Sequence, residues 1–145
     1  MMGSRSKARE CALQALYQLD TSGGNASEVL LGIWSHFDPV DDETRRFAEA
    51  LVRGAQREQE VIDDVIRRSS TNWKIERMAR VDRNVLRLAV YEILRRPDVP
   101  VKVSLNEAIE LSKKYGSEDS SSFVNGILDR VAHATDLPGQ VPKKE

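Results

Sequence analysis

The 145-residue sequence has a single cysteine, two histidines and no apolar run of the roughly 18–20 residues needed to cross a bilayer. Because Cys11 has no second cysteine to pair with, an intrachain disulfide is excluded and a reducing compartment is expected. The basic N-terminus is not followed by the apolar segment of a signal peptide. These absences predict a cytoplasmic protein with one globular domain over residues 1–137 and a polar tail over residues 138–145.

Residue patterns that support catalysis or metal binding are also missing. His36, His133 and Cys11 do not form a metal-ligand pattern, and there is no glycine-rich phosphate loop or nucleophile elbow. The adjacent acids Asp41-Asp42 and Asp63-Asp64 diverge on a helix, which does not suit a shared acid–base site. Cys11 falls on an apolar helix face, where a buried structural thiol is expected. The chain is therefore predicted to be non-enzymatic and to need no cofactor.

Apolar residues recur at three- and four-residue steps along the whole chain, and no stretch alternates as a strand does. This pattern predicts an all-α protein of six to eight helices, among them residues 28–36, 81–96 and 118–134. The first helix should bury Ala8, Cys11, Ala12, Ala15, Leu16 and Leu19. The predicted capping residues are Asp41 or Asp42, Ser104 with Glu107 as a capping box, Gly116 as a C-terminal cap, and Ser117.

Charge is distributed unevenly although the formal net charge is −1. Residues 38–64 hold nine acids and four bases, a balance of −5. Residues 67–96 hold nine bases and three acids, a balance of +6. A basic region within a slightly acidic protein favours a polyanionic partner, although solvated helix faces would give the same pattern.

The predicted helix over residues 81–96 carries the most informative part of the basic region. At about 100° per residue, a stripe about 120° wide gathers polar side chains opposite a broad apolar side. Arginine binds phosphate and stacks on bases, asparagine reads base edges, and tyrosine stacks. The stripe suits nucleic acid, and a solvated arginine face is the alternative. Its residues are Arg83, Asn84, Arg87, Tyr91 and Arg95, and Arg77 and Arg80 extend the basic region.

Two charged residues fall on apolar helix positions. Glu92 lies among the apolar positions of its helix, and Arg9 lies on the flank that carries Leu13 and Leu16. A buried carboxylate is unfavourable unless it is paired. We hypothesise that Arg9 and Glu92 pair across the two helices.

Two residues of the predicted last helix stand out. Gly126 in a helix interior is less stable than alanine by roughly 1 kcal/mol, so a close approach is expected there. Phe123 lies at the edge of the apolar face, beside Asp119 and Ser122. It is then the rim of the core, a stacking surface for a base, or an anchor for a partner.

Four stretches match those of a known family in order and spacing, and the C-terminal half is the most specific part. They are the basic start RSKAR (5–9), ARECALQALY (8–17), VDRNVLRLAVYE (81–92) and VPVKVSLNEAIELSKKYGSEDSSSFVNGILDRV (99–131). The combination resembles the NusB family of transcription antitermination factors. Residues 21–75 match mainly in helical pattern.

The resemblance implies about seven helices in two small bundles. It also implies binding to the boxA segment of nascent ribosomal RNA leaders together with NusE, a small-subunit ribosomal protein, in a bacterial complex that modifies RNA polymerase processivity. By matched position, the RNA surface would comprise Arg5, Lys7, Tyr17, Arg83, Arg87, Asp119 and Phe123. The NusE-facing surface would comprise Tyr17, Glu76 and Asp82.

Two alternatives remain open at this stage: a protein-only helical adaptor, and an accessory of ribosomal RNA processing without sequence-selective RNA binding. NusB-like domains also occur fused to ribosomal RNA cytosine methyltransferases. Because the sequence ends soon after the last predicted helix, no fused catalytic domain is expected. The residue pattern does not decide between a monomer and a homodimer.

The hypothesised pair can be tested with a double-mutant cycle. Arg9→Met alone should lower the free energy of unfolding by roughly 3 kcal/mol, because Glu92 is left buried and unmatched. Adding Glu92→Leu should recover much of that loss. Denaturant melts measure both effects, and simple additivity of the two single changes would contradict the pairing.

Overall fold

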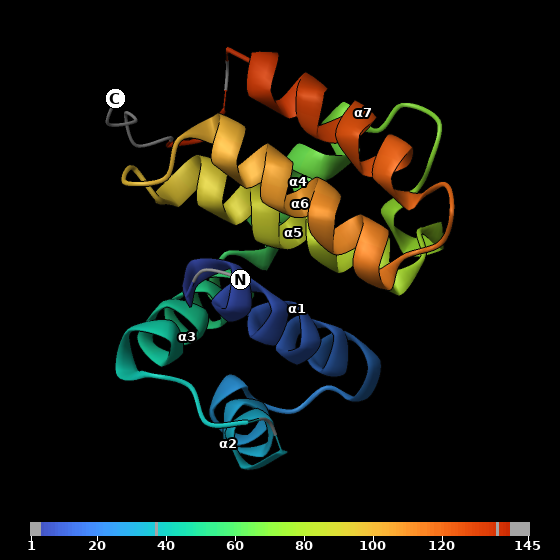
Figure 1. Ribbon diagram of the computed structural model, residues 1–145. Helices are drawn as coiled ribbons and strands as arrows, with labels where there is room; N and C mark the ends of the chain where they lie inside the picture. The colour runs from blue at the N-terminus through green and yellow to red at the C-terminus, as the bar shows by residue number, and fades with distance from the viewer. Residues whose placement is uncertain (1–3, 37, 136, 140–145) are drawn as a thin grey trace. The chain divides into compact units, whose positions relative to one another are not determined.

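The computed structural model describes residues 4–36, 38–135 and 137–139. In these residues the chain forms seven α-helices and one short 3-10 helix, η1, without any strand, which confirms the all-α prediction (Figure 1). No helix in the described part is long and apolar enough to cross a membrane. The elements are α1 (Ser4–Ser22), α2 (Ala26–His36), α3 (Asp42–Arg57), α4 (Gln59–Ser69), η1 (Ile75–Arg77), α5 (Arg80–Arg95), α6 (Val101–Tyr115) and α7 (Ser120–His133).

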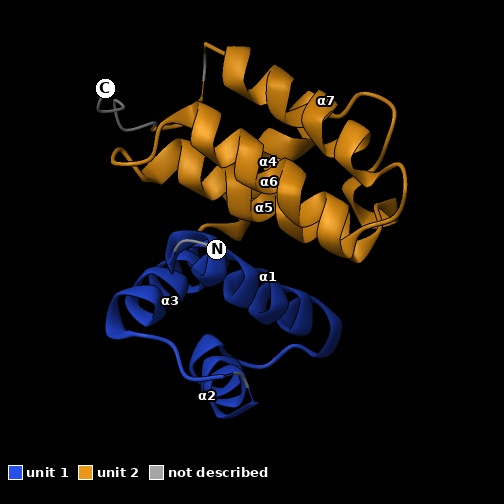
Figure 2. Ribbon diagram, in the orientation of Figure 1, with its two compact units in different colours: residues 1–57 blue, residues 58–145 orange. Residues whose placement is uncertain are grey.

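The helices are grouped into two compact units, in agreement with the two small bundles that the resemblance implies (Figure 2). Unit 1, residues 1–57, contains α1, α2 and α3. Unit 2, residues 58–145, contains α4, η1, α5, α6 and α7.

In unit 1, α1 packs against α2 and α3. The predicted apolar face of α1 is confirmed, since Ala8, Cys11, Ala12, Ala15, Leu16 and Leu19 are all buried. Burial raises the pKa of the Cys11 thiol, which keeps it protonated and disfavours a nucleophilic role.

Two of the predicted capping residues are confirmed. The backbone N–H of Thr44 donates to Asp41 Oδ1 at 2.8 Å, so Asp41 rather than Asp42 caps α3. Hydrogen bonds from the Thr44 side chain and backbone lower the pKa of Asp41. Gly116 occupies the C-cap of α6, where its backbone N–H donates to the carbonyl of Ser112.

The capping box at Ser104 and the cap at Ser117 are wrong. Helix α6 begins at Val101, after Pro100, so Ser104 lies inside the helix. Its buried hydroxyl donates instead to Glu92 Oε1 on α5 at 3.0 Å. Helix α7 begins at Ser120, and the backbone N–H of Ser117 donates to the Ser120 hydroxyl at 2.9 Å. The partner of Ser104 lies on another helix, whereas Ser117 contacts a residue three positions later in a turn that precedes α7.

Helix α5 packs against α4, α6 and α7 and is the central element of unit 2. Every residue from Asn84 to Leu94 is buried, including the polar ones. Glu92 is 1% exposed and Arg9 on α1 is 3% exposed, so both are buried as hypothesised. Since Arg9 and Glu92 belong to different units, their pairing stays a prediction.

Arg95, at the end of α5, binds the start of the predicted tail. Its Nε donates to both carboxylate oxygens of Glu58 at 2.9 Å. Its Nη1 donates to the carbonyl oxygens of Pro138 and Gly139, each at 3.0 Å. The remainder of the predicted tail, residues 140–145, lies outside the described residues.

Gly116 should be required for close packing rather than for its backbone conformation. Its φ is −93°, which any residue adopts, but an added Cβ would lie 2.7 Å from the Ser112 carbonyl oxygen and would also overlap the Ser120 side chain. Gly116→Ala should therefore lower the free energy of unfolding by about 1–3 kcal/mol, measured by urea melts.

Gly32→Ala is the matched control, because Gly32 lies inside α2 with nothing within 4 Å of an added Cβ. That change should raise stability by about 0.5–1 kcal/mol. Destabilisation of similar size at both positions would contradict the steric explanation.

Candidate functional site

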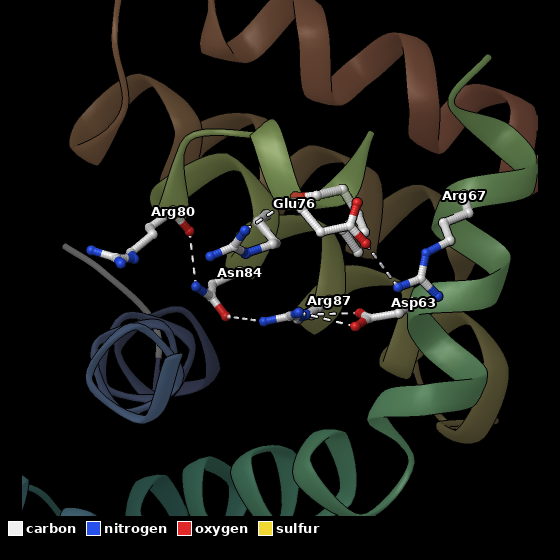
Figure 3. A network of polar contacts seen from close by, with 8 residues as sticks. Asp63, Arg67, Glu76, Arg80, Asn84 and Arg87 are labelled. Atoms are coloured by element: carbon white, nitrogen blue, oxygen red, sulfur yellow. Dashed lines mark hydrogen bonds and ion pairs between the residues drawn. The ribbon is translucent and has the colours of Figure 1, made fainter. Parts of the chain in front are cut away.

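The centre of the predicted arginine stripe is a buried ion pair between α5 and α4 (Figure 3). Arg87 Nε donates to Asp63 Oδ1 at 2.8 Å, and Nη2 donates to Asp63 Oδ2 at 3.0 Å. Arg87 is 8% exposed. Arg87 is therefore buried, because a bidentate carboxylate occupies its guanidinium, and its assignment to the RNA surface stays a prediction.

The other members of the stripe are also engaged within the protein. Asn84 is buried and its side-chain amide donates to the Arg80 carbonyl at 2.9 Å, while Tyr91 is buried as well. Arg83 is half-buried, and its Nη1 donates to the Ile75 carbonyl at 3.1 Å. Arg95 is held by Glu58. The predicted stripe thus belongs mainly to the internal structure of unit 2, whereas Arg77 and Arg80 upstream are exposed.

The adjacent acids of α4 diverge as expected. Asp63 is buried against α5, whereas Asp64 is exposed and pairs with Arg68 Nε at 3.3 Å on the outer face of the same helix. No cluster of three or more histidine, cysteine, aspartate or glutamate side chains that would suit a metal ion occurs in the described part of the chain.

The predicted cations at the start of α1 are half-buried rather than fully exposed. The Arg5 guanidinium lies 4.2 Å from the centre of the Phe47 ring, and Arg9 lies 5.3 Å from it. Lys7 Nζ is 3.9 Å from Glu10 Oε1. Tyr17, the third predicted RNA-facing residue of unit 1, is exposed and lies about 15 Å further along the helix axis than Lys7.

In unit 2, Phe123 of α7 meets Trp73 of the loop between α4 and η1. Their rings are in edge-to-face contact, with centres 6.1 Å apart and planes at 85°. Phe123 is half-buried, as expected for a residue at the rim, and Trp73 is 56% exposed. We refer to Trp73 and Phe123 as the aromatic pair.

A hollow of about 280 Å³, here called the acidic pocket, borders the aromatic pair. It brings together three of the predicted site residues, Asp82, Asp119 and Phe123, and is also lined by Arg77. Asp82 is 8% exposed, and its Oδ1 has no hydrogen-bond partner in the described residues. Leaving a buried oxygen without a hydrogen bond lowers stability by about 1–3 kcal/mol. A bound ligand or partner that donates a hydrogen bond to Asp82 Oδ1 would remove this loss.

Glu76, the other predicted partner-facing acid of unit 2, does not line this pocket. It is exposed and accepts a hydrogen bond from Arg67 Nη2 at 3.2 Å (Figure 3). Its own backbone N–H, followed by Arg67, lowers the pKa of the Glu76 carboxyl. Glu76 is therefore ionised and accessible at neutral pH.

A second hollow of about 230 Å³ borders the same two rings, and we call it the acid-free groove. It lies between residues 70–73 and α7. Its lining includes Asn72, Ser122, Gly126 and Arg130, and no aspartate or glutamate among the residues that the structure describes. The close approach expected at Gly126 is absent, since no atom beyond its own helical turns and chain neighbours lies within 4 Å of an added Cβ.

Sequence reasoning missed Trp73, Asp63 and Arg130. The one available signal was the sequence SSTNW, in which a large aromatic follows a run of polar loop residues. Asp63 was seen only as half of an acidic pair, and Arg130 only as part of a matching stretch.

The helical fold and the two hollows beside the aromatic pair define a small all-helical protein with a candidate binding surface. The model of the NusB family matches residues 6–133. The chain therefore belongs to the NusB family of transcription antitermination factors, which are not enzymes.

Similar proteins are found at high identity. A transcription antitermination protein NusB of Anaeromyxobacter sp. (strain Fw109-5) is 59% identical over 128 residues, covering 88% of this chain and 89% of the relative. That of Myxococcus xanthus (strain DK1622) is 50% identical over 140 residues, covering 94% and 100%.

Solved structures share the fold. T. maritima NusB superposes with a TM-score of 0.84 at 38% identity and covers 95% of this chain and 96% of its own. A structure of the antitermination factors NusB and NusE in complex with double-stranded RNA gives a TM-score of 0.83 at 31% identity, covering 90% and 97%.

The buried ion pair should behave as structure. Arg87→Met should lower the free energy of unfolding by about 3–5 kcal/mol, because Asp63 is left buried without a counter-charge. Adding Asp63→Leu should recover much of this loss, as measured by urea melts.

Arg68→Ala is the control, because its ion pair with Asp64 is exposed and should contribute less than about 1 kcal/mol. An Arg87→Met protein that melts like the wild type would show that the ion pair is not a structural element.

Proposed function

We propose that the protein binds a single-stranded boxA-type segment of nascent ribosomal RNA leader RNA jointly with NusE, and that the complex acts on RNA polymerase to resist termination. The observation that supports this proposal is the lining of the acidic pocket. Asp119 and Phe123, which the family resemblance assigns to RNA, line the same hollow as Asp82, which it assigns to NusE. The proposal implies a location in the bacterial cytoplasm.

Unpaired bases suit this surface better than a duplex does. The faces of bases become accessible to aromatic side chains only when they are unstacked. The aromatic pair, with Trp73 exposed and Phe123 half-buried, supplies such side chains. In unit 1, Arg5 and Lys7 lie in the first turn of α1, where the positive end of the helix dipole and two cationic side chains together favour phosphate. Arg83, Asp119, Phe123 and Tyr17 remain candidates for RNA contact, whereas Arg87 is assigned to the ion pair with Asp63.

Acidic groups suit a protein partner. Glu76 is ionised and exposed, and Asp82 Oδ1 accepts no hydrogen bond within the described residues. A ribosomal protein, which is typically basic because it binds RNA, would supply such donors. We therefore keep Glu76, Asp82 and Tyr17 as the proposed NusE-facing residues.

A protein-only helical adaptor is the competing function. It is favoured by one observation, namely that the central arginines of α5 are used inside the protein rather than offered to phosphate. The two functions differ in whether RNA affinity depends on the RNA sequence.

The deciding experiment titrates labelled single-stranded boxA-type RNA and a scrambled RNA of the same composition, each with and without NusE, and follows fluorescence anisotropy. We expect tighter binding of boxA-type RNA and a further gain with NusE. Equal affinity for the two RNAs in the presence of NusE would reject sequence-selective binding and favour the adaptor.

Phe123→Ala should weaken RNA binding by about 1–3 kcal/mol, because a stacking surface for a base is lost. The melting temperature should change little, since Phe123 is half-buried and not part of the closed core. Titration and thermal melting on the same preparation measure both quantities.

Phe123→Leu is the matched variant, because it keeps an apolar side chain of similar size but removes the aromatic ring. It should lose affinity nearly as strongly as Phe123→Ala. Unchanged RNA affinity in both variants, together with a stability loss of about 3–5 kcal/mol in Phe123→Ala, would assign the ring to the core instead.

A further inference from the structure

Nothing in the described residues explains why position 126 is glycine. Gly126 lies inside α7, its backbone is not in the left-handed region, and the space around an added Cβ is open to 4 Å. Glycine is the least favourable helix residue after proline, so alanine would fit and would stabilise the helix. The open space at Gly126 forms part of the lining of the acid-free groove.

Trp73 borders the same groove and has more of its surface in solvent than a core residue would. Its loop is nevertheless fixed: the Ser70 hydroxyl donates to the Trp73 carbonyl at 2.9 Å, and Arg130 Nη1 donates to the Ser69 carbonyl at 2.9 Å. An exposed aromatic ring on a fixed loop is the kind of platform on which bases stack without a large ordering penalty.

The charges of the two hollows point to different ligand groups. Within the described part of the chain, Arg130 is the only charged side chain that lines the acid-free groove. A guanidinium has five N–H donors, of which the Ser69 carbonyl uses one. The acidic pocket contains Asp82 and Asp119 beside Arg77, so acids outnumber bases in its lining and an anion is less favoured there. A phosphate is therefore favoured in the groove and disfavoured in the pocket.

We propose that the acid-free groove binds one nucleotide of a single-stranded RNA, with its base on Trp73, its phosphate at Arg130 and its remaining atoms against the backbone at Gly126. The groove volume of about 230 Å³ is below the roughly 300–1,000 Å³ of pockets for drug-sized ligands, which suits one base rather than several. Asn72 and Ser122 supply hydrogen bonds to base edges. This subsite rests on the proposed RNA-binding function and extends the RNA path beyond Phe123.

The central test is Gly126→Ala, since it has opposite effects on folding and binding. The added methyl group should raise the melting temperature and occupy the space of the nucleotide. Affinity for boxA-type RNA in the presence of NusE should decrease by roughly 5- to 150-fold, the loss expected for one stacked base. Trp73→Ala should lose affinity to a similar extent, and Trp73→Phe should retain most of it.

Gly32→Ala in α2 is the matched control, because its Cβ also meets open space but lies outside the groove. It should raise the melting temperature and leave RNA affinity unchanged. In a Trp34→Phe background Trp73 is the only tryptophan, so its fluorescence reports directly on the groove. Bound RNA should quench that fluorescence.

The outcomes separate this subsite from the proposed function. If the wild type shows no preference for boxA-type RNA, both fail. If the wild type has that preference but Gly126→Ala and Trp73→Ala bind as tightly, or if RNA binds without quenching Trp73, the groove proposal alone is overturned. If Trp73→Ala weakens binding of NusE in the absence of RNA, the groove takes protein and the proposal is likewise overturned.

Discussion

The buried polar groups of α5 are the constraint on which the rest of unit 2 depends. Arg87 requires Asp63 of α4, and Glu92 accepts a hydrogen bond from Ser104 of α6. An unmatched charge in a low-dielectric interior is expensive, so these pairs fix how far α4 and α6 slide along α5. Helix α7 packs on α5 and α6, and Arg130 ties it to the end of α4. The position of the aromatic pair follows from this series of contacts.

The same contacts explain why the predicted arginine stripe is largely buried. The basic region of residues 67–96 follows an acidic one, residues 38–64, in the sequence. In the fold, Asp63 and Glu58 at the end of the acidic region pair with Arg87 and Arg95 of the basic one. Much of the apparent excess of positive charge is thus neutralised within unit 2. Formal charge along a sequence is therefore a poor measure of the charge offered to a ligand when helices of opposite sign pack together.

The sequence predicts well those features that depend on residues a few positions apart, such as helix faces and helix caps. The buried face of α1 and the cap at Asp41 follow from three- and four-residue spacing, and both are confirmed. The predicted cap at Ser104 is wrong because its partner, Glu92, is on another helix. The burial of Arg87 was not predicted because its partner, Asp63, lies 24 residues earlier in the sequence. Trp73 and Phe123 are fifty residues apart in the sequence, so their contact had no local signal. Such contacts depend on how helices pack, which residue periodicity does not determine.

The two hollows beside the aromatic pair differ in the charge of their linings: aspartates predominate in the acidic pocket, and an arginine lines the acid-free groove. In the pocket, Asp82 Oδ1 has no hydrogen-bond partner among the described residues, and in the groove Arg130 has N–H groups besides the one that donates to Ser69. A nucleotide strand carries both kinds of group within one repeating unit, since base edges bear amino donors and the backbone bears phosphate. A basic protein partner, such as the proposed NusE, would match Asp82 in the acidic pocket but not the groove. The combined chemistry of both hollows, with the exposed ring of Trp73 beside them, therefore favours a single-stranded nucleic acid. The open space at Gly126 is consistent with a ligand that lies directly against α7.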